Sequence, residues 1–483
     1  MTEDHSAPRE KVVVALGVGL VALASRLPFI SLGYALDGDA WFVARAAKHI
    51  AETKSYVHSR PPGFPLHEFM CAIVWPLGPL ASNGLTAVVS AIAAALFALL
   101  VKRMGASARI SALAGIALAF VPIIYVNSTV TLDYLWALAG ILAALLAAHH
   151  HRPAVAGLCL GAAIGCRITS GAMILPVALV LFFQDPGPRR RRQLGVFVCS
   201  TLLTGALLYA PVVLTYGFGF LRFIDVALGP ASRARLTLYG GTIGVWGALG
   251  AIGLGVGILV FAANPARSLR NAALSGQQNK WVLAASLAAI MLFTISFVRF
   301  PIEYAYLIPA VPFALLLLLF LVHRTVSTGI LILMILSPFL VHVDFSLSAS
   351  ARGFLLDDAD KRRDQMHYLA FAYADILGTP AERITAVTGT ETKKFEVLPP
   401  ILASLDFSRP VTLVRDLKPA DMRDLLAAGE VLYFVHKGVF HVDQGYVVEP
   451  AESGGLRVRI RSYPDRAGDH PPGFSPVTAC HSA

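Results

Sequence analysis

The chain has 483 residues, of which 56% are hydrophobic and only 14% are charged, and its formal net charge is +10. A soluble globular protein carries about 25% charged residues, so this composition excludes that class and indicates a polytopic membrane protein. The positive charge does not indicate a nucleic-acid partner, because the Lys and Arg residues lie mainly in short loops between apolar runs, where they set membrane orientation.

Apolar runs long enough to cross about 30 Å of hydrocarbon recur along residues 1–343. They predict an α-helical membrane domain with about eleven transmembrane helices, the first of which we interpret as a retained anchor. The predicted spans are residues 11–29, 69–101, 110–126, 132–148, 154–166, 171–183, 194–214, 241–263, 281–297, 304–322 and 326–341. The five cysteines show neither C-x-x-C spacing nor a cluster with histidines, so no disulfide framework or zinc site is predicted.

Basic residues predict the orientation of these spans. If the N-terminus is cytoplasmic, basic turns such as 102–103 and 189–192 also fall on the cytoplasmic side. The opposite face then receives the outer loop 30–68 and seven ionisable residues from distant parts of the chain: Asp37, Asp39, Arg60, Asp133, Arg167, Arg299 and Glu303. Ionisable groups at span ends are costly to desolvate, so a convergent set predicts a site more readily than it predicts seven separate contacts with water.

The outer loop 30–68 carries two carboxylates, Asp37 and Asp39, on either side of Gly38. One of them could act as a general base while the other positions a substrate or cation. The alternative is that Asp39 caps a short amphipathic helix from Ala40 to about Thr53 and Asp37 is solvated. These residues alone leave both readings open.

Besides the carboxylates, three arginines are predicted on the face opposite the cytoplasm. Arg60, Arg167 and Arg299 are candidates for holding a phosphate, because a guanidinium pairs with two phosphate oxygens and stays charged near lipid. The alternative for each is a lipid headgroup or a carboxylate such as Glu303. His58 precedes Arg60 and could donate to a departing phosphate.

The composition changes after His342, where charged residues become abundant. Residues 344–463 are predicted to form a small α/β domain outside the membrane, followed by a disordered tail at 464–483. Its predicted helices are residues 357–377 and 420–428, and its predicted strands are residues 383–387, 411–414, 431–435 and 456–460.

These motifs resemble, over residues 11–322, the GT-C superfamily of membrane glycosyltransferases, which use polyprenyl-phosphate sugars. Within it, the chain is similar to the protein O-mannosyltransferases and the lipid A aminoarabinose transferases. The matching segments are 37–39 (DGD), 60–65 (RPPGFP), 127–133 (NSTVTLD), 167–171 (RITSG) and 299–304 (RFPIEY). The chain differs from the aminoarabinose transferases in having Ser59-Arg60-Pro61-Pro62 where they have Glu-Lys-Pro-Pro.

The resemblance implies a hexosyl- or pentosyltransferase in a bacterial inner membrane, with its site on the extracytoplasmic face. The sugar would pass from a polyprenyl-phosphate donor to a hydroxyl of a glycan, lipid or protein, with Asp37 or Asp39 as the base. Arg60, Arg167 and Arg299 would hold the donor phosphate. The residues expected to position substrates are His58, Asp133, Glu303 and Tyr304. No cofactor is predicted, and a divalent cation is left open.

The alternative function is a polytopic transporter or a flippase for a lipid-linked sugar. Transporters commonly place their charges near the bilayer midplane, between repeated halves of the chain. Here the charges gather at one face and the sequence shows no internal repeat. The sequence therefore favours the glycosyltransferase.

Overall fold

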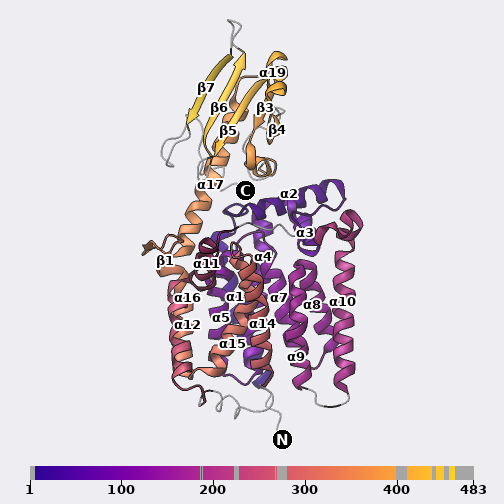
Figure 1. The fold of residues 1–483 in the computed structure, drawn as a ribbon, viewed down its shortest axis with the longest axis vertical. Coiled ribbons are helices and arrows are strands. Elements are labelled where there is room, and N and C mark those ends of the chain that lie inside the picture. The colour runs from indigo at the N-terminus through magenta and orange to yellow at the C-terminus, as the bar shows by residue number, and fades with distance from the viewer. Residues whose placement is uncertain are drawn as a thin grey trace.

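In the computed structural model, the chain is described for residues 6–184, 187, 189–221, 228–266, 268, 280–398, 411–437, 442–450 and 456–462. These residues form an elongated molecule, with a bundle of helices at one end and a small sheet with its own helices at the other (Figure 1). We call residues 354–462 the C-terminal region. The tail that was predicted to be disordered, residues 464–483, lies outside the described residues.

The bundle is built from apolar helices. They are α1 (Ser6–Arg26), α3 (Pro65–Val74), α4 (Gly78–Arg103), α5 (Ala108–Phe120), α7 (Tyr134–His149), α8 (Pro153–Cys166), α9 (Ile174–Gln184), α10 (Arg189–Tyr216), α12 (Val245–Ala263), α14 (Lys280–Arg299), α15 (Val311–Leu321) and α16 (Arg324–Leu340). Within the described part of the chain, six helical stretches are long and apolar enough to cross a membrane, and five shorter apolar helices accompany them. Each span predicted from the sequence falls on one of these stretches.

The outward surface of the bundle carries many exposed apolar side chains. On α10, Leu203 and Leu207 expose 63% and 66% of their surface. Because such side chains lie along whole helices rather than in isolated spots, the surface faces hydrocarbon instead of water. The protein is an integral membrane protein.

Helix α8 packs closely against α10 through a row of glycines. Gly157, Gly161 and Gly165 are four residues apart, so they lie on one face of α8. A methyl group on Gly157 would lie 2.6 Å from the carbonyl oxygen of Phe197, and one on Gly165 would lie 2.6 Å from the side chain of Leu208. The two backbones therefore approach closely, as small residues allow in membranes.

Helix α2 (Gly38–Thr53) lies across the end of the bundle that faces the C-terminal region (Figure 1). The apolar face that was predicted for this helix is buried, and it consists of Ala40, Ala44, Ala47 and Ile50. Trp41 is also buried, and its indole nitrogen donates a hydrogen bond to the carbonyl oxygen of Ala35 at 2.8 Å. These contacts fix the start of α2, where the two aspartates lie.

The C-terminal region begins with α17 (Phe354–Gly378) and contains one five-stranded sheet in the order β4-β3-β5-β6-β7. Its elements are β3 (Ile384–Val387), α18 (Thr392–Phe395), β4 (Val411–Val414), α19 (Pro419–Ala427), β5 (Val431–Lys437), β6 (Val442–Pro450) and β7 (Leu456–Ser462). Strands β4, β3 and β5 are parallel, whereas β6 and β7 are antiparallel additions. The four predicted strands and two predicted helices match elements of this region, but β6 was not predicted.

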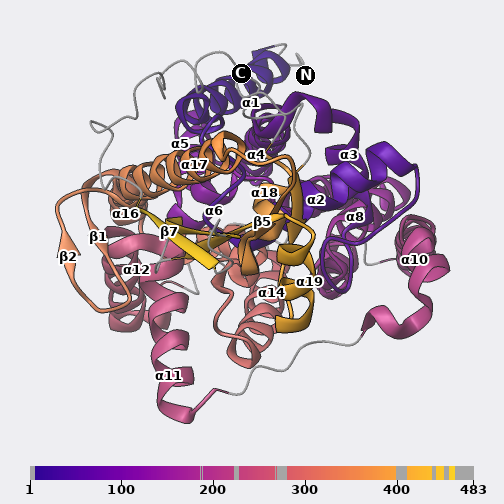
Figure 2. The ribbon, with the colours of Figure 1, turned by 90° about the horizontal axis from the view of Figure 1, so that it is seen from above.

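Arg362 joins the C-terminal region to the bundle. Its side chain is buried, and its guanidinium donates to the carbonyl oxygens of Leu32, Gly33 and Thr129 at 3.0–3.2 Å. A buried guanidinium is costly unless its donors are satisfied. This contact therefore holds α17 against the loop before Asp37 and the loop before Asp133. Figure 2 shows α17 from above, where it begins close to α16.

Candidate active site

A buried carboxylate holds the loop that carries Arg60. Both oxygens of Glu68, in the first turns of α3, accept two hydrogen bonds each. The donors are the Ser59 backbone N–H at 2.7 Å and hydroxyl at 2.6 Å, the Tyr56 hydroxyl at 2.6 Å and the Phe64 backbone N–H at 3.1 Å. Because each lone-pair direction is used, the loop around Arg60 has a defined shape.

A second contact fixes Asp133 beside the outer loop. The side-chain amide of Asn83, on α4, donates to the carbonyl oxygens of Ile30 and Gly33 at 2.8 and 2.9 Å. The Thr131 hydroxyl donates to the amide oxygen of the same Asn83 at 2.8 Å. One buried asparagine therefore connects the loop before Asp37 to the loop before Asp133.

Four of the predicted site residues form one chain of ion pairs. Arg60 Nε lies 2.9 Å from Asp39 Oδ2, and Arg60 Nη2 lies 2.9 Å from Asp133 Oδ1. The other oxygen of Asp133 lies 2.6 Å from Arg167 Nη1. The side chain of Asp133 is fully buried, whereas that of Asp39 is 33% exposed. The chain of pairs therefore runs from the interior of the bundle to the surface beneath the C-terminal region.

Aromatic rings surround the two arginines. Arg60 stacks on Phe64 at 4.2 Å, and Arg167 lies 3.9 Å from the centre of the Tyr134 ring and 4.9 Å from that of Tyr306. Such rings stabilise a guanidinium without using its N–H donors. Arg60 Nη1 is buried and has no hydrogen-bond partner within the described part of the chain. It is the donor that a substrate oxygen could use.

The helix cap was predicted on the wrong aspartate. Asp37, not Asp39, is the N-cap of α2: its backbone is extended, and its Oδ1 accepts from the Asp39 backbone N–H at 2.9 Å. Helix α2 begins at Gly38, two residues earlier than predicted, which moves the cap by the same distance. The carboxylate of Asp39 is therefore left to pair with Arg60.

Asp37, Asp39 and Glu303 form an acidic cluster. One carboxylate oxygen from each lies within 4.8 Å of the others, and within the described residues these three could hold a metal ion. Burial raises the pKa of Asp39, although the adjacent Arg60 opposes the rise. Burial, reinforced by the charge of Asp37, raises the pKa of Glu303 to about 7. These two carboxyl groups therefore take up protons more readily than exposed ones do.

Asp133 is buried, and both of its oxygens are paired with arginines, Oδ1 with Arg60 and Oδ2 with Arg167. It therefore orients the two arginines.

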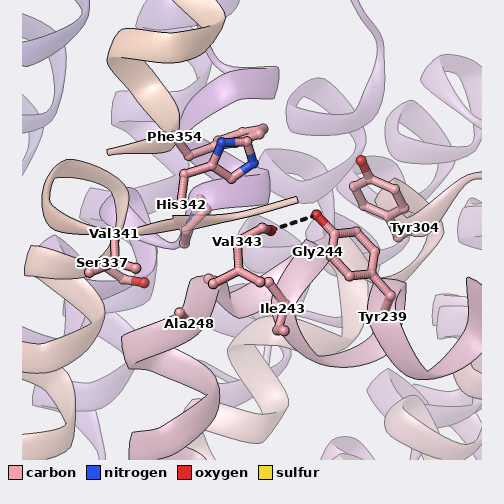
Figure 3. A pocket seen from close by; sticks show the side chains of 12 residues that line it. Tyr239, Ile243, Gly244, Ala248, Tyr304, Ser337, Val341, His342, Val343 and Phe354 are labelled. Carbon is pink, nitrogen blue, oxygen red and sulfur yellow. Dashed lines mark hydrogen bonds between the residues drawn. The ribbon is translucent and has the colours of Figure 1, made fainter. Parts of the chain in front are cut away.

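Three other predicted site residues have contacts elsewhere in the structure. His58 stacks on Tyr216 of α10 at 4.1 Å. Arg299 is exposed at the end of α14, and its carbonyl oxygen accepts from Arg233 at 3.1 Å. Tyr304 lines a small pocket in which the Tyr239 hydroxyl donates to the carbonyl oxygen of Val343 at 3.0 Å (Figure 3). Their roles toward a substrate stay predictions.

Sequence reasoning missed Glu68 as a functional residue. A carboxylate within an apolar helical run is costly to bury unless it is fully bonded, so its position was a usable signal. It also missed Lys393, which comes from the C-terminal region and reaches the start of α2. No local sequence pattern indicates that contact.

The helical bundle and the small α/β region above it confirm the predicted fold class, an α-helical polytopic membrane protein with a small C-terminal α/β region. Among solved structures, the chain is similar to ArnT from Cupriavidus metallidurans, crystallised with undecaprenyl phosphate. The TM-score is 0.51 at 14% sequence identity, and the match covers 88% of this chain and 93% of that one. No family model and no curated protein sequence matches the chain.

Proposed function

We propose that this protein is a membrane glycosyltransferase that moves a sugar from a polyprenyl-phosphate donor to a hydroxyl group of a glycan, lipid or protein. The observation that carries the proposal is the chain of ion pairs from Asp39 through Arg60 and Asp133 to Arg167. It supports the proposal because a carboxylate that could act as a base lies beside an arginine that could bind a phosphate, at one end of an apolar bundle. The likeness to ArnT, which was crystallised with undecaprenyl phosphate, supports the choice of donor.

Asp39 is the proposed base. Its carboxylate takes the proton of the acceptor hydroxyl while the acceptor oxygen bonds to the anomeric carbon. The bond from that carbon to the phosphate oxygen breaks in the same step, and the lipid phosphate leaves with the electron pair. Arg60, through its unpaired Nη1, and Arg167 stabilise the charge on the departing phosphate.

We also infer that the site lies on the extracytoplasmic face of a bacterial inner membrane. Arg324 donates to the Ser107 hydroxyl at 3.1 Å, so the turns after α4 and before α16 meet at one end of the bundle. That end also carries Lys102 and Arg103, which supports a cytoplasmic position under the positive-inside rule. The acidic cluster lies at the opposite end, beneath the C-terminal region.

The proposal is tested in a deletion strain that carries the wild-type gene, Asp39→Asn or Asp37→Asn. Mass spectrometry of envelope glycans and membrane lipids should show a missing sugar linkage and an accumulated polyprenyl-phosphate sugar in the deletion strain. Wild type should restore the linkage and Asp39→Asn should leave less than about 1% of it, because the base is lost. Asp37→Asn keeps an N-capping oxygen and should retain most transfer. Full restoration by Asp39→Asn would contradict the assignment of the base.

A further inference from the structure

A lysine of the C-terminal region lies beside Gly38, the glycine between the two aspartates. Lys393, on α18, lies with its ammonium 3.6 Å above the ring of Phe42 on α2. The same ammonium lies only 2.6 Å from the position that a Cβ atom on Gly38 would take. Gly38 stands between Asp37 and Asp39, so glycine at this position leaves room for the ammonium beside both carboxylates.

The segment around Lys393 is docked on α2 by other contacts. Arg45 Nε lies 2.6 Å from Glu396 Oε2, and Lys48 donates to the Glu396 carbonyl oxygen at 3.0 Å. The neighbouring Lys394 is buried in an ion pair of 2.6 Å with Glu391. Lys393 is therefore not needed to hold the C-terminal region in place, and its position requires another explanation.

The net charge of the neighbouring site residues explains the position of Lys393. Four acids, Asp37, Asp39, Asp133 and Glu303, gather around two arginines, Arg60 and Arg167, which leaves an excess of two negative charges when all are ionised. Lys393 reduces this excess to one. It lies beside Gly38 on the side of the C-terminal region, whereas Arg60 pairs with Asp39 from the outer loop.

Electrostatics keep Lys393 available for this role. Burial lowers its pKa, whereas the carboxylates of Glu391, Asp39 and Asp37 act in the other direction. Within the described residues, the groups that act on it from each packed element are these three acids and Lys394. A lysine that is half-buried against a ring and lies next to acids retains its charge at low cost.

We propose that Lys393 is a positioning residue that the C-terminal region supplies to the transfer reaction: its ammonium orients the Asp39 carboxylate toward the acceptor while Arg60 binds the donor phosphate. This inference rests on the proposed function, because it assigns the C-terminal region a part in that same site. It acts through Asp39 and makes no bond to the transferred sugar.

The test uses the full chain in liposomes that contain membrane lipid extract from the deletion strain, which supplies donor and acceptor. Lys393→Met should lower turnover by about tenfold or more, because the base is misoriented, while affinity for undecaprenyl phosphate changes by less than about threefold. Lys393→Arg should recover a large part of the turnover. Lys48→Met removes a contact with the same docked segment but no charge at the aspartates, so it should keep near-wild-type turnover.

A second substitution, at Gly38, displaces the Lys393 ammonium without changing the lysine itself. Gly38→Ala places a methyl group where the ammonium lies, and the flexible lysine end can move away without unfolding the protein. It should lower turnover about as much as Lys393→Met, and the double variant should lose little more than either one, because both remove the same contact.

Three results would overturn the inference: full turnover by Lys393→Met, an equal loss in Lys48→Met, or no recovery by Lys393→Arg. As a control, thermal unfolding of each variant is measured in detergent. Equal unfolding temperatures show that all the variants compared are folded. If the wild-type protein transfers no sugar, the proposed function fails, and this inference fails with it. If wild type is active and Lys393→Met is equally active, only the inference fails.

Discussion

Asp37 and Asp39 are separated by one glycine, yet they have different chemistry. Asp37 is exposed and caps α2, whereas Asp39 is partly buried and pairs with Arg60. The sequence could predict both as candidates but could not choose, because the choice depends on which residue begins the helix. A shift of two residues in that boundary transfers the cap from one aspartate to the other.

Glu303 provides a test by pH. Burial and Asp37 raise its pKa to about 7, so it is neutral below that pH and gains a negative charge as the pH rises through 7. Arg167 acts on Glu303, and we expect the lipid phosphate to lie near Arg167. The affinity of wild type for undecaprenyl phosphate, relative to that of Glu303→Gln, should therefore fall by about 3- to 10-fold between roughly pH 6 and pH 8.

The ratio of the two affinities is the informative quantity. The phosphate itself titrates in this range, with a second pKa of about 6, and that titration is common to both proteins. Equilibrium binding to the purified proteins at several pH values provides the measurement. A ratio that stays constant with pH would show that Glu303 does not act on the bound phosphate.

The sequence anticipated Asp39, Arg60, Asp133 and Arg167 as one group from their sidedness in the membrane, and the structure joins them directly. It could not anticipate Lys393, because this residue lies 354 positions after Asp39 and only tertiary packing brings the two close. Membrane topology predicts on which face of the membrane a residue lies, but only tertiary packing determines which of these residues are in contact.

At the scale of elements, the loop from α2 to α3 depends on Glu68. Each of its oxygens accepts one backbone N–H, from Ser59 or from Phe64. Glu68→Gln puts an amide N–H₂ against one of these fixed donors, which should cost about 2 to 3 kcal/mol. We expect a thermal unfolding temperature lower by about 2 to 3 °C, and weaker binding of undecaprenyl phosphate because Arg60 loses its support.

Glu52→Gln is the matched control for this substitution, because Glu52 is exposed on α2. It should leave both the unfolding temperature and lipid binding unchanged. An unfolding temperature of Glu68→Gln equal to that of Glu52→Gln would mean that the four hydrogen bonds do not support the loop.

The glycine row on α8 gives a second prediction at this scale. A methyl group on Gly161 would lie 2.4 Å from Thr204 Cβ and 3.0 Å from the Thr201 carbonyl oxygen, so α8 must move away from α10. Helix α8 ends at Cys166, directly before Arg167, and Gly161→Ala should therefore lower both the unfolding temperature and the rate of transfer.

Gly195→Ala on α10 is the control, since a methyl group there meets open space. In a helix this exchange should be neutral or stabilising by up to about 1 kcal/mol. Thermal unfolding of both variants in detergent decides the matter: if Gly161→Ala unfolds no earlier than Gly195→Ala, close packing of α8 on α10 is not required.

At the scale of the whole molecule, hydropathy predicted the helices of the bundle well, because hydrocarbon demands long apolar runs. The sheet was predicted less completely. Strand β6 has Gly445 in its interior and acids near both ends, so it lacks the pattern of a buried strand, and pairing with β5 and β7 stabilises it instead. The position of the C-terminal region above α2 follows from Arg362 and Glu396, which no periodicity indicates.

This position is consistent with the part proposed for the C-terminal region in the transfer reaction. It is held against the two aspartate-bearing loops by a buried arginine, and it places Lys393 beside Gly38. In the proposed reaction, Arg60 and Arg167 would hold the lipid phosphate, and Lys393 would add a positive charge from the C-terminal region. We therefore expect transfer to require both the bundle and the C-terminal region.

The most direct test of the central claim follows the donor lipid in liposomes that contain purified protein and lipid extract from the deletion strain. Mass spectrometry measures the polyprenyl-phosphate sugar and the free polyprenyl phosphate over time. The account predicts that wild type converts the first into the second with transfer of the sugar to an acceptor, and that Asp39→Asn does not. Movement of the lipid-linked sugar between leaflets with its sugar still attached would contradict the account and support a flippase.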